Sequence, residues 1–228
     1  MELMIIAGTV FLLTHLGISS TSLRGSLVSA LGEAGYLLAY SIVAALSLAA
    51  MIWVYGLVPR YEYFWLPDPW FNEATRYVMP LATILLAGSF LVKNPGSVGM
   101  ERALDDPRLE EPARGLLRIT RHPMQWSIVL WSAAHVAANG DKVSVVFFGT
   151  FLVLGLAGGA LIDRKRSTRL GPAWGRYAAV TSNIPFVAIL RGRNRLVVRE
   201  LLLPAAVGIV VYFGLLALHP WIAGVPVP

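Results

Sequence analysis

The chain has 228 residues, of which 56% are hydrophobic and only 14% are charged, with a formal net charge of +6. A soluble globular domain carries about 25% charged residues, so this composition excludes an ordinary soluble domain and predicts an integral membrane protein. Cysteine is absent, which excludes disulfides, thiolate metal sites, iron–sulfur clusters and catalysis by a thiol. In a membrane protein the basic residues mark the cytoplasmic side, so the positive charge does not indicate nucleic acid as a partner.

Uncharged segments along the chain predict an all-α, polytopic membrane helix bundle with about six transmembrane helices in a single domain over residues 1–228. Several segments are shorter than the ~20 residues that a span needs, so flanking residues are expected to complete them. The third is doubtful, because Arg76 and Lys93 bracket it and Pro80 lies inside it. The first lacks a basic region and a cleavage site, so it is expected to be a retained span rather than a signal peptide. The six segments are 3–18, 35–57, 77–92, 123–138, 143–162 and 201–218.

The distribution of Lys and Arg predicts the orientation of these segments. Most basic residues lie in the connections after the first, third and fifth segments, whereas only Arg60, Arg76 and Lys142 lie on the opposite side. The positive-inside rule then places both termini outside the cytoplasm, with cytoplasmic loops over about 93–122 and 163–200. We therefore expect a multi-pass protein of a bacterial-type inner membrane, with lipid as its first partner.

The connection 61–71, on the predicted outer side, is dense in aromatic residues. Tyrosine and tryptophan gather at the headgroup level of membranes, so one interpretation is an interfacial belt. The other interpretation is a lid over the mouth of a site for an apolar ligand. The sequence does not decide between them.

Two histidines, His15 and His135, lie deep inside apolar segments and are the leading candidates for a functional site. An ionisable side chain at such depth is costly, so by default it indicates function. Each lies thirteen residues, about 20 Å, from a membrane face, so the two differ in height by only about 10 Å if they approach from opposite sides. Facing helices would let both ligate one haem, with Trp131 packing on the porphyrin, although imidazole also suits Zn, Cu or Ni.

A simpler interpretation is that each histidine only satisfies a hydrogen bond inside the bundle. The neighbouring polar side chains that offer such bonds are Thr14, Ser19 and Ser20 for His15, and Asn139 for His135.

Arg121 and His122 lie at the start of the fourth segment, just before Pro123, which suits the first turn of a helix. At the cytoplasmic rim this pair would bind an anion, such as a cofactor carboxylate or a lipid phosphate. The alternative is an interfacial anchor whose charged groups reach out to the headgroups. The fourth histidine, His219, precedes Pro220 and is expected to be interfacial.

Several short blocks, occurring in family order over nearly the whole chain, resemble the NnrU family of membrane proteins. The resemblance implies haem b held by two histidines at positions matching His15 and His135, and it implies isomerase chemistry on a polyene or a role linked with denitrification. A non-catalytic subunit of a larger membrane complex remains an alternative. The matching blocks are Thr14-His15-Leu16-Gly17, Leu23-Arg24, Ile119 to Pro123, Leu130-Trp131, Ala134-His135 and Asn139-Gly140-Asp141.

A second and more distant resemblance is to isoprenylcysteine and phospholipid methyltransferases. That resemblance implies S-adenosylmethionine binding at Arg121 and His122, helped by a later acidic pair. This sequence departs from the pattern, because Asp163 is followed by the basic run 164–166, which repels a sulfonium. Methyl transfer is therefore the alternative to a haem-dependent isomerase or redox protein. The methyltransferase-like positions further along the chain are Leu170-Gly171, Trp174, Tyr177 and Ile184-Pro185.

Overall fold

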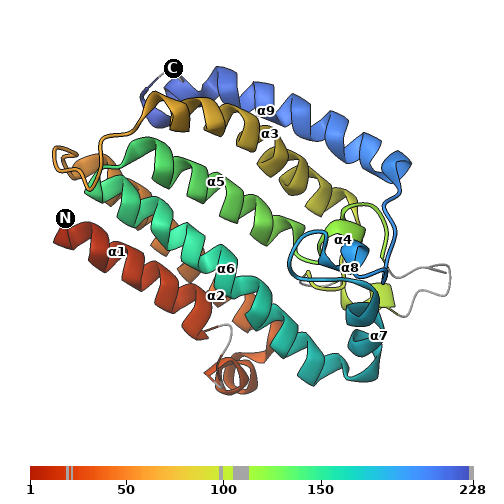
Figure 1. Cartoon of the computed structure of the whole chain (residues 1–228). Coiled ribbons are helices and arrows are strands. Elements are labelled where there is room, and N and C mark those ends of the chain that lie inside the picture. The colour runs from red at the N-terminus through yellow and green to blue at the C-terminus, as the bar shows by residue number, and fades with distance from the viewer. Residues whose placement is uncertain (19–20, 22, 98–99, 105–112, 226–228) are drawn as a thin grey trace.

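A computed structural model describes residues 1–18, 21, 23–97, 100–104 and 113–225, and the regular elements in these ranges are helices. Six of them run alongside one another as a bundle (Figure 1). Helix α6 packs against α1 and α5, and α3 packs between α5 and α9, while α2 lies against α1. Their bounds are α1 (Glu2–Leu12), α2 (Leu23–Leu57), α3 (Pro69–Leu91), α5 (Pro123–Asn139), α6 (Lys142–Leu170) and α9 (Leu202–Ala223).

The two ends of the bundle differ in character (Figure 1). Helix α1 begins and α9 ends at the end where the α2–α3 and α5–α6 connections lie, and we call this the outer end. At the opposite, inner end the chain forms short helical elements. These are η2 (Glu101–Leu104), α4 (Leu116–Ile119), α7 (Pro172–Val180), α8 (Val187–Leu190) and η3 (Val198–Leu201).

Four helical stretches are long and apolar enough to cross a membrane, by length and composition. They are Leu23–Leu57, Pro69–Leu91, Lys142–Leu170 and Val198–Ala223, while Glu2–Ile18 is a shorter apolar helix and α5 has 17 residues. The all-helical membrane class is thus confirmed. The six spans, the cytoplasmic side and the bacterial inner membrane stay predictions.

The third predicted segment, which the sequence left doubtful, is a continuous helix that starts eight residues earlier than expected. The Asp68 carboxylate accepts a hydrogen bond of 2.8 Å from the Trp70 amide, and Pro69 occupies the first helical position. This combination of an N-cap and a proline is a strong helix start. Arg76 and Pro80 therefore lie inside α3 and do not bound it.

Helix α6 also exceeds its prediction, because it continues past residue 162 to Leu170 and ends before Gly171, whose φ is +50°. The charged residues 163–166 are consequently helical, and α7 and α8 follow them within the predicted loop 163–200. At Gly155 of α6 a Cβ would lie 2.8 Å from a methyl carbon of Val129 of α5. This glycine lets α5 and α6 pack closely.

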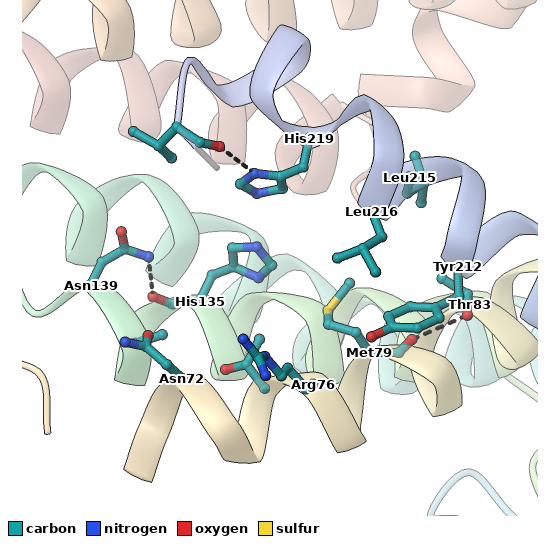
Figure 2. A pocket seen from close by; sticks show the side chains of 13 residues that line it. Asn72, Arg76, Met79, Thr83, His135, Asn139, Tyr212, Leu215, Leu216 and His219 are labelled. Atoms are coloured by element: carbon teal, nitrogen blue, oxygen red, sulfur yellow. Dashed lines mark hydrogen bonds between the residues drawn. The ribbon is translucent and has the colours of Figure 1, made fainter. Parts of the chain in front are cut away.

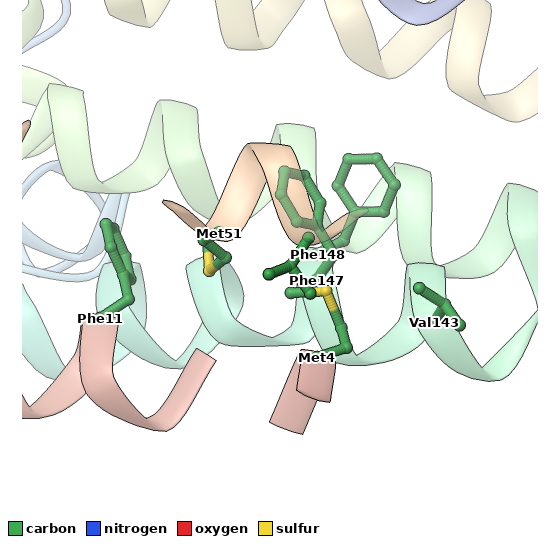
Figure 3. Close-up of a cluster of buried hydrophobic side chains, with 7 residues drawn as sticks. Met4, Phe11, Met51, Val143, Phe147 and Phe148 are labelled. Carbon is green, nitrogen blue, oxygen red and sulfur yellow. The ribbon is translucent and has the colours of Figure 1, made fainter. Parts of the chain in front are cut away.

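An apolar cluster of methionine and aromatic side chains packs α1 and α2 onto α6 (Figure 3). Burial of such side chains is worth roughly 1.5–3 kcal/mol each in water, but in lipid the packing contacts themselves supply the stabilisation. The buried members are Met4, Phe11, Met51, Val54, Val143, Phe147 and Phe148.

The aromatic outer connection is bound to the α5–α6 turn. The Phe64 amide donates to the Gly140 carbonyl oxygen at 2.9 Å, and the Trp65 indole donates to the Ala137 carbonyl oxygen at 3.2 Å. The Lys142 ammonium pairs with the Glu62 carboxylate at 2.7 Å. These contacts hold the connection over the outer ends of α5 and α6, while Tyr61 and Trp70 stay exposed.

Candidate functional site

His135 lines a cavity of about 170 Å³ between α3, α5 and α9, which we call the outer cavity. Figure 2 shows the imidazoles of His135 and His219 on opposite sides of it, with Met79 and Tyr212 further along. The surface of the lining is mostly apolar, although polar or charged side chains of α3, α5 and α9, among them Arg76, also line it. A mostly apolar surface on which polar groups converge is typical of a small-molecule site.

A backbone hydrogen bond fixes the orientation of the His135 ring. Its Nδ1 lies 2.7 Å from the Trp131 carbonyl oxygen. A carbonyl oxygen only accepts, so Nδ1 carries the proton and the lone pair of a neutral ring is on Nε2. Metal-ligating histidines are oriented in this way by a partner on their other nitrogen.

His15 lies in the π-helical turn η1 (Leu13–Ile18) and lines a second cavity, of about 220 Å³, between η1, α2, α5 and α6. We call it the inner cavity. The His15 Nδ1 lies 2.8 Å from the Phe11 carbonyl oxygen, four residues back, as in His135. Single π-helical turns are frequent at functional sites. Tyr40, Gln125 and Lys165 line the same cavity.

A chain of aromatic rings connects the two histidines. The Phe11 ring is 4.0 Å from the His15 ring and 5.3 Å from Phe151, and Trp131 is 5.2 Å from Phe151 and 5.3 Å from His135. The two imidazoles are thus brought to opposite ends of one aromatic cluster and line different cavities. Trp131 packs beside His135, as its spacing predicted.

The donor set of these residues fits haem better than a bare metal ion. Within the described ranges no three His, Cys, Asp or Glu side chains come together as a metal site. A porphyrin supplies four nitrogen ligands of its own, so haem needs only one or two imidazoles from the protein. His15 and His135 each suit that role by chemistry. Ligation of the same iron by both requires Phe11, Trp131 and Phe151 to leave the space between them.

Arg121 and His122 form a buried network with Asp163 of α6 at the inner end. The His122 Nε2 is 2.7 Å from Asp163 Oδ1, and the Arg121 guanidinium contacts both carboxylate oxygens, with its Nε 2.8 Å from Oδ1. Arg121 and His122 thus do bind an anionic group, as predicted for this pair, but in this structure the group is the Asp163 carboxylate of the same chain. The same pairing neutralises the acid that a methyltransferase would offer to a sulfonium.

The simpler interpretation is right that His135 meets a hydrogen-bond partner, but the partner is the Trp131 carbonyl oxygen and not the Asn139 side chain. The Asn139 amide donates to the backbone carbonyl oxygen of His135 at 2.7 Å and not to the imidazole. Thr14 Oγ1 does lie 3.4 Å from the His15 Nδ1, whereas Ser19 and Ser20 lie outside the described residues. His219 Nδ1 is 2.8 Å from the Val225 carbonyl oxygen near the outer end.

Sequence reasoning missed Tyr40, Gln125 and Lys165 as companions of His15. Gln125 gave no clear signal, because at 100° per residue it lies about 80° around the helix from His135, and the two residues line different cavities. Lys165 gave no signal, because α6 was expected to end before it.

These features define a multi-helix membrane protein with two imidazole-lined cavities inside its bundle. The chain belongs to the NnrU family, whose model, described as NnrU protein, matches residues 3–227. No solved structure matches the chain.

Two plant proteins are similar to the chain, and both are named 15-cis-zeta-carotene isomerase, chloroplastic. The protein from Zea mays is 30% identical over 195 residues, which cover 85% of this chain and 52% of the relative. The protein from Arabidopsis thaliana is 27% identical over 187 residues, which cover 81% of this chain and 49% of the relative. The chain thus spans about half the length of these relatives.

Proposed function

We propose that the protein is an intramembrane isomerase that acts on an apolar, carotenoid-like polyene and uses haem b as its cofactor. The observation that carries the proposal is the shared geometry of His15 and His135. Each Nδ1 is bound to a carbonyl oxygen four residues back, and each ring lines a cavity inside the bundle. Membership of the NnrU family and the similarity to two carotene isomerases support the substrate class.

The proposed roles follow from the position of each group. His15 and His135 would hold the iron, and the carbonyl oxygens of Phe11 and Trp131 keep their rings in the tautomer that ligation needs. Bound haem would supply an iron that can change its redox state close to the double bonds of the substrate. The rings of Phe11, Trp131 and Phe151 lie between the two imidazoles, so they would have to move aside for both to hold one iron.

The outer cavity supplies a surface for the substrate. Met79, Tyr212 and Leu216 line it, and flexible thioether and aromatic groups adapt to an extended hydrocarbon. Leu215 at the same cavity is 41% exposed, so a substrate dissolved in lipid can reach it from the surface of α9.

An absorption spectrum of the protein, purified in detergent from a haem-replete host, tests the cofactor. We expect a Soret band that His15→Ala and His135→Ala each shift or abolish. His219→Ala is the matched control, because its ring lines the outer cavity but has no part in the proposal. Colourless protein of wild-type sequence would refute the haem assignment, and a band sensitive to His219 alone would reassign the ligand.

Conversion of a 15-cis carotene to its trans isomer in membranes, followed by chromatography, tests the reaction. The wild-type protein is expected to accelerate it, and both histidine variants are expected to be inactive. A normal Soret band without isomerisation would contradict the isomerase and leave a haem protein with another substrate.

A further inference from the structure

The inner cavity carries polar groups at two levels. Gln125 lies in the first turn of α5 and Lys165 in the last two turns of α6, so both belong to the inner end of the bundle. His15 is about 20 Å from the outer start of α1, whereas Lys165 is about 35 Å from the outer start of α6, at 1.5 Å per residue. The cavity therefore extends from an imidazole within the bundle to an ammonium near its inner end.

Between these two levels the wall of the cavity is apolar and partly free of side chains. Leu154, Leu161 and Ile128 line it, and α6 also contributes Gly155 and Gly158, which have no side chain. At Gly158 a Cβ would be in ordinary contact with Gln125, 3.6 Å from its Cγ, and at Gly155 it would press on α5. The glycines thus give α6 a flat surface toward the cavity.

Only one member of the basic run 164–166 lines this cavity. Arg164 is exposed, and the buried Arg166 donates to the Ser97 carbonyl oxygen at 2.8 Å. Lys165 is the member that reaches the cavity wall, and its four-carbon stem spans several ångströms between backbone and charge.

We propose that Lys165 and Gln125 bind the carboxylates of the haem whose iron is ligated by His15. The ligand that this cavity suits has a flat apolar body, a metal centre and an acidic edge. Lys165 forms an ion pair with one carboxylate, and the Gln125 amide donates a hydrogen bond to it. This assignment rests on the proposed function and adds to it the residues that orient the cofactor.

Titration of the full-length apo-protein in detergent with two porphyrins tests the assignment. The probes are iron protoporphyrin IX and its dimethyl ester, which keeps the iron and the macrocycle but has no acidic group. We expect the wild-type protein to bind the diacid about tenfold more tightly than the ester, the size of one charge-assisted contact. Lys165→Gln should lose this preference, and Lys165→Arg should retain it.

Arg164→Gln is the matched control, because it removes the same charge one residue away from the cavity. The assignment is overturned if Lys165→Gln keeps the wild-type preference, or if the wild-type protein binds both porphyrins equally with a normal Soret band. If Arg164→Gln and Lys165→Gln lower the preference for the diacid equally, the assignment is also overturned, because the preference then comes from the overall positive charge and not from a contact with Lys165. If neither porphyrin shows a Soret band shifted from that of the same porphyrin free in detergent, the haem proposal itself is refuted.

Discussion

The imidazole of His122 and the carboxylate of Asp163 form a hydrogen bond of 2.7 Å that joins the start of α5 to α6. The His122 side chain is only 1% exposed and that of Asp163 is 20% exposed. Arg121 binds the same carboxylate, so two basic groups depend on one acid. This network lies at the inner end of the bundle, next to Ile162 of α6, which lines the inner cavity.

Asp163→Asn is expected to lower the free energy of unfolding by roughly 2–5 kcal/mol. The change leaves the Arg121 guanidinium, 13% exposed, without its carboxylate. Removing one partner of a buried charge pair costs about 3–5 kcal/mol, and the partial exposure of Asp163 lowers that cost. Thermal unfolding in detergent measures it.

Glu73→Gln is the control for this change, because Glu73 pairs with Arg76 at 3.4 Å on the surface and both side chains are about half exposed. Such a pair is worth roughly 0–1 kcal/mol. Equal stabilities of the two variants would contradict a structural role for the Asp163 network.

Tyr177→Phe is expected to leave stability unchanged or to raise it by about 1 kcal/mol. Tyr177 is fully buried, and its hydroxyl has no hydrogen-bond partner among the described residues. Burial raises the pKa of this phenol well above its usual value. An unsatisfied buried hydroxyl costs about 1–3 kcal/mol, so removing it relieves that cost. Thermal unfolding decides, and a loss of more than about 1 kcal/mol would mean that the hydroxyl has a partner.

The sequence predicted the membrane class and the approximate positions of the long helices, because apolar composition dominates both. It misjudged helix ends where a charge lies inside a helix. Arg76 interrupted the apolar run, although Asp68 and Pro69 already signalled the start of α3. The apolar run of α6 stops at Asp163, but the helix continues to Leu170. A charged side chain does not interrupt the backbone hydrogen bonds of a helix, so the end of an apolar run is not the end of the helix.

The sequence named His15 and His135 as candidate ligands, and that role stays a prediction. Counting residues along a helix gives the depth of each histidine but not the arrangement of the two rings. Which side chains lie between them depends on how α1 and α6 pack, and spacing within one helix carries no such information. Phe11 and Phe151 therefore became visible as the intervening rings only in three dimensions.

Gly208→Ala is expected to destabilise the packing of α9 on α3 by roughly 1–3 kcal/mol. A Cβ at Gly208 would collide with the backbone of Ile84, which cannot move aside as a flexible side chain would. Overpacking of this kind costs about 1–3 kcal/mol. The measurement is the unfolding midpoint in detergent.

Gly214→Ala is the matched control in the same helix, because no atom lies within 4 Å of a Cβ at that position. Alanine favours a helix over glycine by up to about 1 kcal/mol, so the control should be neutral or stabilising. If Gly214→Ala is also destabilised, the loss in Gly208→Ala does not come from a collision with Ile84.

Glu62→Gln is expected to loosen the outer connection at neutral pH but not in acid. The hydrogen bond and the charge of the Lys142 ammonium lower the pKa of Glu62 below its ordinary value of 4.5. Because the pKa is lower in the folded protein, the contribution of the pair is complete above 4.5 and is lost as the pH falls through the lowered value. Hydrogen exchange of a peptide covering residues 59–68 should be faster in the variant at about pH 7, and the difference should shrink as the pH falls further below 4.5. Lys142→Gln should reproduce the loosening at neutral pH, and a difference that persists in acid would show that the Glu62 charge is not its cause.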